Sequence, residues 1–323
     1  MIKYSVVTPV FNRSDCVERC LESVTRNLRE RDDIEHIVVD DGSTDSSAMI
    51  MRKYQKEHSH VRCIFFPHNR GTNAARNAAI ASAKGKFCII LDSDDYWDEN
   101  ALATIDKTVS AYPDIRHFCF APDDMLQTYA KNPLLAGKPE CILSFADFLL
   151  GRVSGDFVHV MSTDIVRRHP FDEELRIYEG VFFLAFYKEA KTILFVNKVV
   201  SHRERGRNDS VSYDFLRTNR IVVERTIKAE EHLIRHFEND LRLYNEGKDI
   251  LYNKKLKLLE NHLLLSEYDD AGKLIKNIED DNNGKALKKY KIIYRFRLGY
   301  FYFVLIKLFL FAKYRLLKIH LKY

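Results

Sequence analysis

Residues 87–95 read Phe87-Cys88-Ile89-Ile90-Leu91-Asp92-Ser93-Asp94-Asp95, an apolar run that ends in three carboxylates. A short apolar run of this kind predicts a buried strand. Clustered carboxylates repel one another and lose hydration, so such a cluster normally needs a cation. Hard oxygen ligands that leave coordination positions open suit Mn or Mg holding a phosphate. The stretch therefore predicts a strand whose end carries a divalent metal and a nucleotide diphosphate.

Strand and helix patterns alternate around this stretch through the first 112 residues. Such an order predicts an α/β fold with a mainly parallel central sheet and helices on both faces. The expected strands are 3–10, 35–39, 61–66 and 86–91, and the expected helices are 14–28, 46–58, 72–83 and 98–112.

Polar loops follow each of the expected strands. In parallel α/β sheets, ligands bind beyond the carboxyl ends of the strands. We therefore expect these loops to gather at one edge and to form the ligand site. They are 8–13, 40–45, 68–71 and 92–95.

The remainder of the chain changes character twice. Residues 113–212 hold five of the seven prolines and less regular patterns, with strand-like pieces at 116–120, 158–162 and 192–200. We interpret them as the second half of one domain, 1–212. From 213 to 281 the pattern is helical, and residues 263–271 resemble the turn of a helical hairpin.

The end of the chain is strongly basic. Residues 282–323 contain eleven Lys and Arg and no Asp or Glu, so residues 1–281 carry a net charge of −6 against +5 for the whole chain. This asymmetry argues for a localised anionic partner and against a nucleic-acid-binding body. The apolar part, 298–312, is too short to span a bilayer and is interrupted by Lys307. We predict an amphipathic helix on an anionic membrane surface, the alternative being a helix docked on the protein.

Cysteine usage and the start of the chain bear on location. The six cysteines are scattered, mostly in apolar runs, as expected of core residues in a reducing compartment. Met1 leads at once into a strand-like pattern, so no secretory signal is predicted. We expect a cytoplasmic protein, peripheral on the inner face of the cell membrane.

Four motifs in order resemble glycosyltransferase family 2, in particular bacterial surface-polysaccharide enzymes. They are Thr8-Pro9-Val10-Phe11-Asn12-Arg13, Val38-Val39-Asp40-Asp41-Gly42-Ser43-Thr44-Asp45, Asn69-Arg70-Gly71 with Ala75-Arg76-Asn77, and Leu91-Asp92-Ser93-Asp94-Asp95. The resemblance implies a GT-A fold and an inverting enzyme that uses a nucleotide sugar. It also implies that 1–112 is the nucleotide-sugar half and 113–212 the acceptor half. It covers roughly residues 3–100 closely and continues more weakly to 212.

The resemblance implies roles for individual residues in donor binding. Asp41 would accept a hydrogen bond from the uracil imide, Asp94 would bind the metal, and Asp92 with Ser93 would touch the ribose or donor sugar. A calcium loop fits the acidic cluster poorly, because Tyr96 occupies the next alternate ligand position. The remaining donor residues are Thr8, Pro9 and Phe11 around the base, and Asn69 and Arg76 at the ribose or diphosphate.

An inverting transfer needs a base that takes the proton of the acceptor hydroxyl. In the family an acidic residue before an aromatic pair, after a Phe-Asp-Glu stretch, fills this role, and here the match is Glu179. Gly180 stands where a second acidic residue is common in the family. The alternative is that Glu179 is a surface glutamate at the start of a helix.

A basic segment follows the expected strand 192–200. By the same resemblance, Arg203 or Arg205 would clamp phosphate and His202 would be a further metal ligand. A lone histidine is more often structural.

Together these observations predict a hexosyl- or N-acetylhexosaminyl-transferase that uses a UDP-sugar and Mn or Mg. The expected acceptor is a saccharide, lipid-linked, in the synthesis of a bacterial surface polysaccharide such as O-antigen or capsule. One alternative is a sugar-nucleotide nucleotidyltransferase, which would release pyrophosphate. Another is a non-catalytic membrane-bound scaffold of the same fold.

Overall fold

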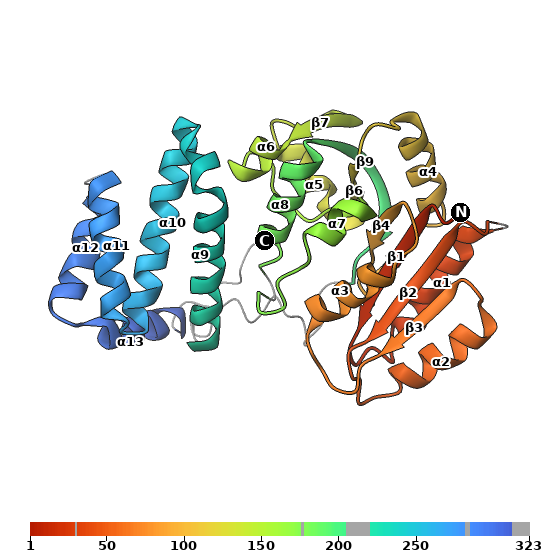
Figure 1. Cartoon of the computed structure of the whole chain (residues 1–323), viewed down its shortest axis with the longest axis horizontal. Helices are drawn as coiled ribbons and strands as arrows, with labels where there is room; N and C mark the ends of the chain where they lie inside the picture. Colours follow the sequence, from red (N-terminus) through yellow and green to blue (C-terminus); the bar gives the residue numbers. More distant parts are fainter. Residues whose placement is uncertain (30, 176–177, 205–219, 282–284, 312–323) are drawn as a thin grey trace. The chain divides into compact units, whose positions relative to one another are not determined.

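The chain folds into two compact units, Met1–Arg207 and Asn208–Tyr323 (Figure 1). The computed structural model describes residues 1–29, 31–175, 178–204, 220–281 and 285–311. The first unit combines a central sheet with helices, and the described part of the second unit is helical. Each unit has a hydrophobic core of its own.

The sheet of the first unit joins a parallel half to a mixed half. Its strand order is β3-β2-β1-β4-β8-β6-β9-β5, and β7 pairs with β9. All pairs among β1 to β4 are parallel, whereas β8 is antiparallel to both β4 and β6. The predicted α/β fold with its parallel sheet is confirmed. The strands are β1 Tyr4–Val10, β2 Ile34–Asp40, β3 Val61–Phe65, β4 Phe87–Ile90, β5 Tyr96–Trp97, β6 His117–Pro122, β7 Glu140–Ser144, β8 Val158–Ser162 and β9 Thr192–His202.

Helices cover both faces of this sheet. Side chains alternate along each strand, so Val7 belongs to the core under α3, α7 and α8, whereas Val6 belongs to the core under α1 and α4. The helices are α1 Val17–Leu28, α2 Ser47–Glu57, α3 Thr72–Ser82, α4 Ala101–Ala111, α5 Leu126–Lys131, α6 Phe145–Leu149, α7 Thr163–Arg168 and α8 Gly180–Ala190, with a 3₁₀ turn at Asp123–Met125.

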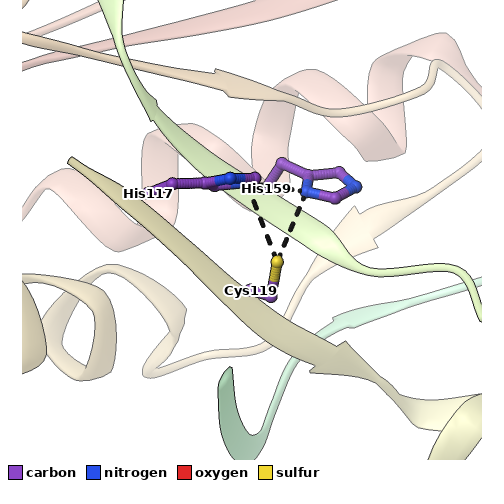
Figure 2. A group of neighbouring side chains, drawn as sticks. All are labelled: His117, Cys119 and His159. Atoms are coloured by element: carbon purple, nitrogen blue, oxygen red, sulfur yellow. Dashed lines mark hydrogen bonds between the residues drawn. The ribbon is translucent and has the colours of Figure 1, made fainter. Parts of the chain in front are cut away.

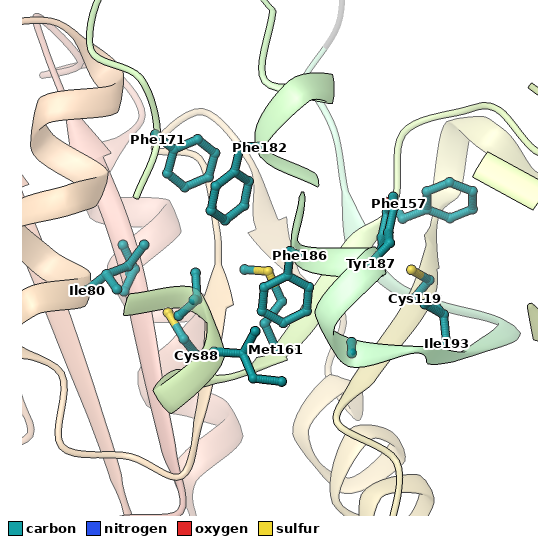
Figure 3. Close-up of a cluster of buried hydrophobic side chains, with 14 of the residues drawn as sticks. Ile80, Cys88, Cys119, Phe157, Met161, Phe171, Phe182, Phe186, Tyr187 and Ile193 are labelled. Carbon is teal, nitrogen blue, oxygen red and sulfur yellow. The ribbon is translucent and has the colours of Figure 1, made fainter. Parts of the chain in front are cut away.

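Helix α8 is held on the sheet by aromatic side chains (Figure 3). Phe182 and Phe186 lie in the same buried cluster as Met161 of β8. Phe182 also stacks on Phe171, with ring centroids 3.8 Å apart. Burial of large rings contributes strongly to a core. The packing therefore sets the position of Glu179, the residue at the start of α8.

The predicted elements of the first 112 residues agree with the observed ones to within three residues at each end. The first expected helix begins at Val17 rather than residue 14, because the backbone of Arg13 accepts hydrogen bonds from Cys16 and Val17 in a turn. Short elements were not predicted, among them β5, β7 and α5 to α7. All six cysteines are free thiols.

The second unit is a set of packed helices. The predicted hairpin turn lies between α10 and α11. Leu287 and Ile293 of α12 share a core with Leu259 of α10, so residues 285–311 form part of this unit rather than a separate tail. Residues 312–323 lie outside the described part. The helices are α9 Arg220–Arg242, α10 Asn245–Leu264, α11 Tyr268–Asp281, α12 Lys285–Arg295 and α13 Gly299–Phe311.

Within the described residues, none of the helices combines the length and apolar character needed to cross a bilayer.

Candidate active site

The loops at the carboxyl ends of the parallel strands are tied to one another by hydrogen bonds. The backbone N–H of Asn12, after β1, donates to Ser43 Oγ in the loop after β2 (2.9 Å). Asp41 of that same loop accepts from the backbone N–H groups of Arg70 and Gly71, in the loop after β3 (2.7 and 2.8 Å). The expected gathering of polar loops therefore exists as a connected layer.

Asp41 is a buried carboxylate that holds the third loop in place. Each of its oxygens already accepts one backbone N–H. The neighbouring Gly42 has φ +71°, and a Cβ there would lie 2.5 Å from the carbonyl carbon of His68. Only glycine fits such a close approach. A hydrogen bond from a ligand to Asp41 would use the carboxylate lone pairs that the two backbone N–H groups do not occupy.

The predicted base-binding residues at the end of the first strand differ in how exposed they are. Thr8 is fully buried, and its hydroxyl pairs with His36 Nε2 at 2.8 Å, inside the sheet. Burial, together with the charge of His60, lowers the pKa of His36 to about 3, so this partner is neutral. Pro9 is also buried. Phe11 is 40% exposed and is the aromatic face that a base can reach.

The sequence did not predict a ligand contact for Asp40. Its Oδ2 accepts a long hydrogen bond from the N–H of Ser43 (3.4 Å), as expected of a residue that shapes a turn. Its Oδ1 is buried and has no hydrogen-bond partner among the described residues. A buried acceptor without a partner is costly, so it is a natural place for an N–H of a ligand. Asn69, in the next loop, is exposed.

Arg76 links the acidic loop to the predicted base. Its Nη2 lies 2.8 Å from Asp92 Oδ1, and its Nη1 lies 3.4 Å from Glu179 Oε1. Only 12% of the Arg76 side chain is exposed, against 24% for Glu179. The carboxylates at the end of β4 and at the start of α8 therefore lie on either side of one guanidinium.

Helix α3 positions the segment that leads to Glu179. Asn77 donates to the carbonyl of Phe171 (2.8 Å) and accepts from its N–H (2.9 Å). Asn73 donates to the carbonyl of Asp172 (2.9 Å). Residues 73, 76 and 77 share one helix face, so two asparagines and an arginine on an alanine-rich helix are the sequence signal for this contact.

The acidic loop carries an uneven charge. Burial opposes ionisation of Asp92, but the positive charge of Arg76 outweighs it and lowers the pKa of Asp92. Burial and then the charges of Asp92 and Asp94 raise the pKa of Asp95 to about 8, against the opposing charge of Arg203. Ser93 between them is buried. Ionisation is therefore favoured at Asp92 and opposed at Asp95.

Arginines approach this loop from two sides. Arg13 Nε lies 3.7 Å from Asp94 Oδ2, and Arg19 donates to the backbone carbonyl of Asp94 (3.0 Å). Arg203 Nε lies 3.8 Å from Asp95 Oδ2, and its Nη1 pairs with Asp156 at 2.8 Å. The predicted phosphate-binding Arg203 therefore lies beside the loop, and Arg205 is outside the described residues.

His202 is held by carboxylates on both ring nitrogens. Nδ1 lies 3.2 Å from Asp123 Oδ2, and Nε2 lies 3.2 Å from Asp98 Oδ2. Its ring also stacks on Tyr96, with centroids 5.1 Å apart. A metal at this histidine would have to displace one of the two carboxylates.

Comparison with known proteins shows which part of the chain resembles a known family. The model of the family described as glycosyl transferase family 2 matches residues 5–121, which include the four loops. The match covers 117 of the 323 residues of the chain. The chain thus carries a glycosyltransferase domain, and the acidic loop, Arg76 and the Asp41 loop all fall within it.

A curated relative matches nearly the whole chain. It is the GalNAc(5)-diNAcBac-PP-undecaprenol beta-1,3-glucosyltransferase of Campylobacter jejuni, 26% identical over 302 residues, which are 91% of this chain and 87% of the relative. Three further bacterial glycosyltransferases match over 98 to 105 residues, and the matches span 16 to 38% of their lengths.

Solved glycosyltransferases share the fold. Residues 1–349 of TarS from S. aureus superpose with a TM-score of 0.62 at 16% identity, over 98% of this chain and 92% of that one, and TarS 1–349 has also been solved with UDP-GlcNAc (TM-score 0.58). The mannosyltransferase PcManGT from Pyrobaculum calidifontis, solved with GDP-Man and Mn2+, gives 0.53 at 16% identity, over 95% of this chain and 87% of that one. The glycosyltransferase domain has the GT-A fold that the resemblance implied.

Proposed function

We propose that this chain transfers a sugar from a UDP-sugar to a hydroxyl group of a saccharide, with inversion at the anomeric carbon. The observation that carries the proposal is the contact of Arg76 with both Asp92 and Glu179. It brings the carboxylates of the donor loop and the predicted base to one edge of the sheet. An inverting transfer needs both groups around the same anomeric carbon.

The donor side is built by the first two strand ends. Phe11 offers an exposed ring for a base, and Asp40 and Asp41 offer carboxylate acceptors for the N–H of uracil. A carboxylate prefers this N–H to the bare N3 of cytosine. The UDP-GlcNAc complex of TarS, which has the same fold, supports a UDP-sugar for this chain.

The acidic loop fits a divalent metal by the chemistry of its donors. Asp92, Asp94 and Asp95 supply carboxylate oxygens within four residues, and hard oxygen ligands suit Mn and Mg. Asp94 would hold the ion, which when bound neutralises the leaving diphosphate. His202 is a ligand in this proposal only if it releases Asp98 or Asp123. The Mn2+ complex of PcManGT supports such a metal.

Glu179 acts as the base. Its carboxylate takes the proton of the acceptor hydroxyl while the hydroxyl oxygen forms its bond to the anomeric carbon. On the opposite side the bond from that carbon to the diphosphate oxygen breaks, and UDP leaves with the electron pair. Arg13 and Arg203, beside the acidic loop, stabilise the charge on the leaving group.

A lipid-linked saccharide is the acceptor that we propose, because the relative matched over nearly the whole chain, the Campylobacter jejuni enzyme, is named for a PP-undecaprenol substrate. Helix α13 adds a physical argument. Its inward residues Tyr302, Phe303 and Ile306 pack on the helical unit, while Phe301 and Phe309 are exposed. We infer that this exposed face and the basic end of the chain hold the enzyme on the inner leaflet, where a bacterial surface polysaccharide such as O-antigen or capsule begins.

The test separates donor binding from chemistry. Asp94→Asn should abolish the Mn-dependent thermal stabilisation by UDP and the turnover with it. Glu179→Gln should keep that stabilisation and lose on the order of 100-fold or more in turnover, measured as UDP released from UDP-glucose or UDP-GlcNAc with a saccharide acceptor.

Glu189→Gln is the matched control, because Glu189 lies at the far end of α8 and pairs with Arg168 and His169. It should turn over like the unaltered enzyme. Release of pyrophosphate in place of UDP would point to a nucleotidyltransferase. Full turnover in both the Asp94 and Glu179 variants would contradict the proposal.

A further inference from the structure

Two strands of the mixed half of the sheet bring two histidines and a cysteine together (Figure 2). In the antiparallel pair β6–β8, Cys119 lies directly opposite His159, and His117 lies opposite Met161. Residues 117 and 119 are two apart on one strand, so their side chains share a face. His117, Cys119 and His159 therefore point from neighbouring strands into one layer, which we call the HCH cluster.

The atoms of the HCH cluster form a compact triangle. His117 Nε2 lies 3.0 Å from His159 Nδ1, and Cys119 Sγ lies 3.7 and 3.6 Å from these two nitrogens. Ligand atoms around tetrahedral zinc are separated by about 3.3 Å between two nitrogens and about 3.6 Å between nitrogen and sulfur, given the usual zinc bond lengths. Among the described residues, no other group of three His, Cys, Asp or Glu side chains brings its ligand atoms within 4.8 Å of one another.

The surroundings of the cluster are apolar and aromatic. His117 and Cys119 are fully buried, and His159 retains 8% exposure. The ring of His117 stacks on Tyr187 at 5.1 Å, and that of His159 stacks on Phe183 at 4.1 Å. Nδ1 of His117 is buried and has no hydrogen-bond partner among the described residues. Three polar groups at the centre of an apolar layer need a reason to be there.

Two imidazoles and one thiol are donor groups that metals coordinate. Burial lowers the pKa of His117 well below its usual value, and burial with the charges of Arg203 and Arg76 lowers that of His159 to about 3. Neutral imidazole is the form of histidine that coordinates metals. Burial raises the pKa of the Cys119 thiol, and a coordinating metal ion removes that proton.

We propose that His117, Cys119 and His159 bind a zinc ion, with water in the fourth position. On binding, the S–H bond of Cys119 breaks, its proton passes to solvent and a zinc–thiolate bond forms. Zinc undergoes no redox change, and two imidazoles with one thiolate are ligands it prefers. The ion would join β6 to β8 beneath α8, so its role would be to stabilise this half of the sheet. The proposal is independent of the sugar-transfer proposal.

The experiment measures metal in the purified full-length chain. After growth with zinc and removal of loosely bound metal, elemental analysis should find about one zinc per chain. Replacement by Co²⁺ should give the near-ultraviolet charge-transfer band of a cobalt–thiolate bond, which requires no variant. Unaltered protein that holds only background zinc and shows no such band would overturn the proposal.

Variants then locate the ion. Cys119→Ala should lose the zinc and the cobalt band, whereas Cys88→Ala should keep both. Cys88 is the matched control, because it is equally buried, lies in the same core and is not one of the ligands. If Cys119→Ala does not fold, His159→Gln provides the second test and should weaken zinc binding about tenfold or more in a competition with a chelator. Equal zinc loss in Cys88→Ala, or full retention in the Cys119 or His159 variant, would contradict the assignment.

Discussion

Arg76 is placed between two carboxylates that are far apart in the chain, Asp92 of the acidic loop and Glu179 at the start of α8. A guanidinium can do this because its planar fork presents several N–H donors in fixed directions. A lysine in the same place carries the same charge at a single point. The geometry of the arginine, and not only its charge, therefore keeps the predicted base at a set distance from the donor loop.

Arg76→Lys tests this role. We expect the lysine to keep the positive charge but to lose the simultaneous contact with Asp92 and Glu179, so that Glu179 is no longer held in position. Misplacement of a catalytic group by about 1 Å costs on the order of 100-fold in rate, and we expect a loss of this order in turnover. UDP release measures it.

Arg26→Lys is the control, because Arg26 forms an exposed pair with Glu22 on α1. It should behave as the unaltered enzyme. Near-normal turnover in Arg76→Lys would show that charge alone suffices.

Away from the candidate site, ion pairs and hydrogen bonds also hold elements of the first unit together. Asp106 of α4 forms an ion pair with Lys3 and accepts hydrogen bonds from Tyr4 Oη (2.9 Å) and Arg31 Nη1, which lies 3.0 Å away. Burial alone would raise the pKa of Asp106, but the hydrogen bonds from Lys3, Arg31 and Tyr4 lower it to about 2. This network fastens the start of β1 to α4.

The network predicts a pH-dependent stability. Because the folded-state pKa of Asp106 is below the unfolded value, its contribution is present above about pH 4 and is lost as the pH falls toward 2. Asp106→Asn should cost about 2 kcal/mol in free energy of unfolding at pH 7 and about half of that at pH 3. Urea denaturation at the two pH values measures the difference.

Asp114→Asn serves as the control for this comparison, because Asp114 is exposed. It should leave stability unchanged at either pH. An equal cost of Asp106→Asn at pH 7 and pH 3 would rule out the charged network as its source.

At the scale of the whole molecule, the chain consists of two units with different surfaces. Helix α13 in the helical unit presents Tyr300, Phe301, Leu305, Leu308 and Phe309 to its surroundings. Contiguous apolar surface of this kind marks an interaction site. The adjacent segment is basic, and its apolar and positive character together fit an anionic membrane surface.

The double variant Phe301→Ser/Phe309→Ser tests membrane association. It removes two exposed rings and leaves the inward face of α13, including Phe303, in place. We expect partitioning onto anionic liposomes to fall at least about tenfold, since each buried ring contributes on the order of 2 kcal/mol. Activity on a soluble acceptor should remain.

Met49→Ser is the matched control, because Met49 is an exposed apolar residue on α2 in the other unit. It should sediment with liposomes as the unaltered protein does. Unchanged sedimentation of the double variant would contradict the role of α13 in membrane binding.

The sequence predicted individual site residues less completely than it predicted elements. It proposed Phe11, Asp92 and Glu179 as site residues, and the structure places them at strand ends and at a helix start. It did not foresee that Thr8 turns inward to His36, because a strand residue's pairing depends on the strand beside it. It also did not predict that Asp40 Oδ1 is buried without a hydrogen-bond partner among the described residues, because only the folded structure shows which acceptors lack donors.

The sequence by itself determined the alternating strands and helices of the first 112 residues and the polar loops at one edge, because apolar periodicity and the polar residues that end it act over a few neighbours. Only the tertiary structure decided which distant groups meet. Arg76 reaches Glu179 across 103 positions, and the HCH cluster joins Cys119 to His159 across 40 positions. Such contacts depend on strand order and register, which are set by the packing of the whole core.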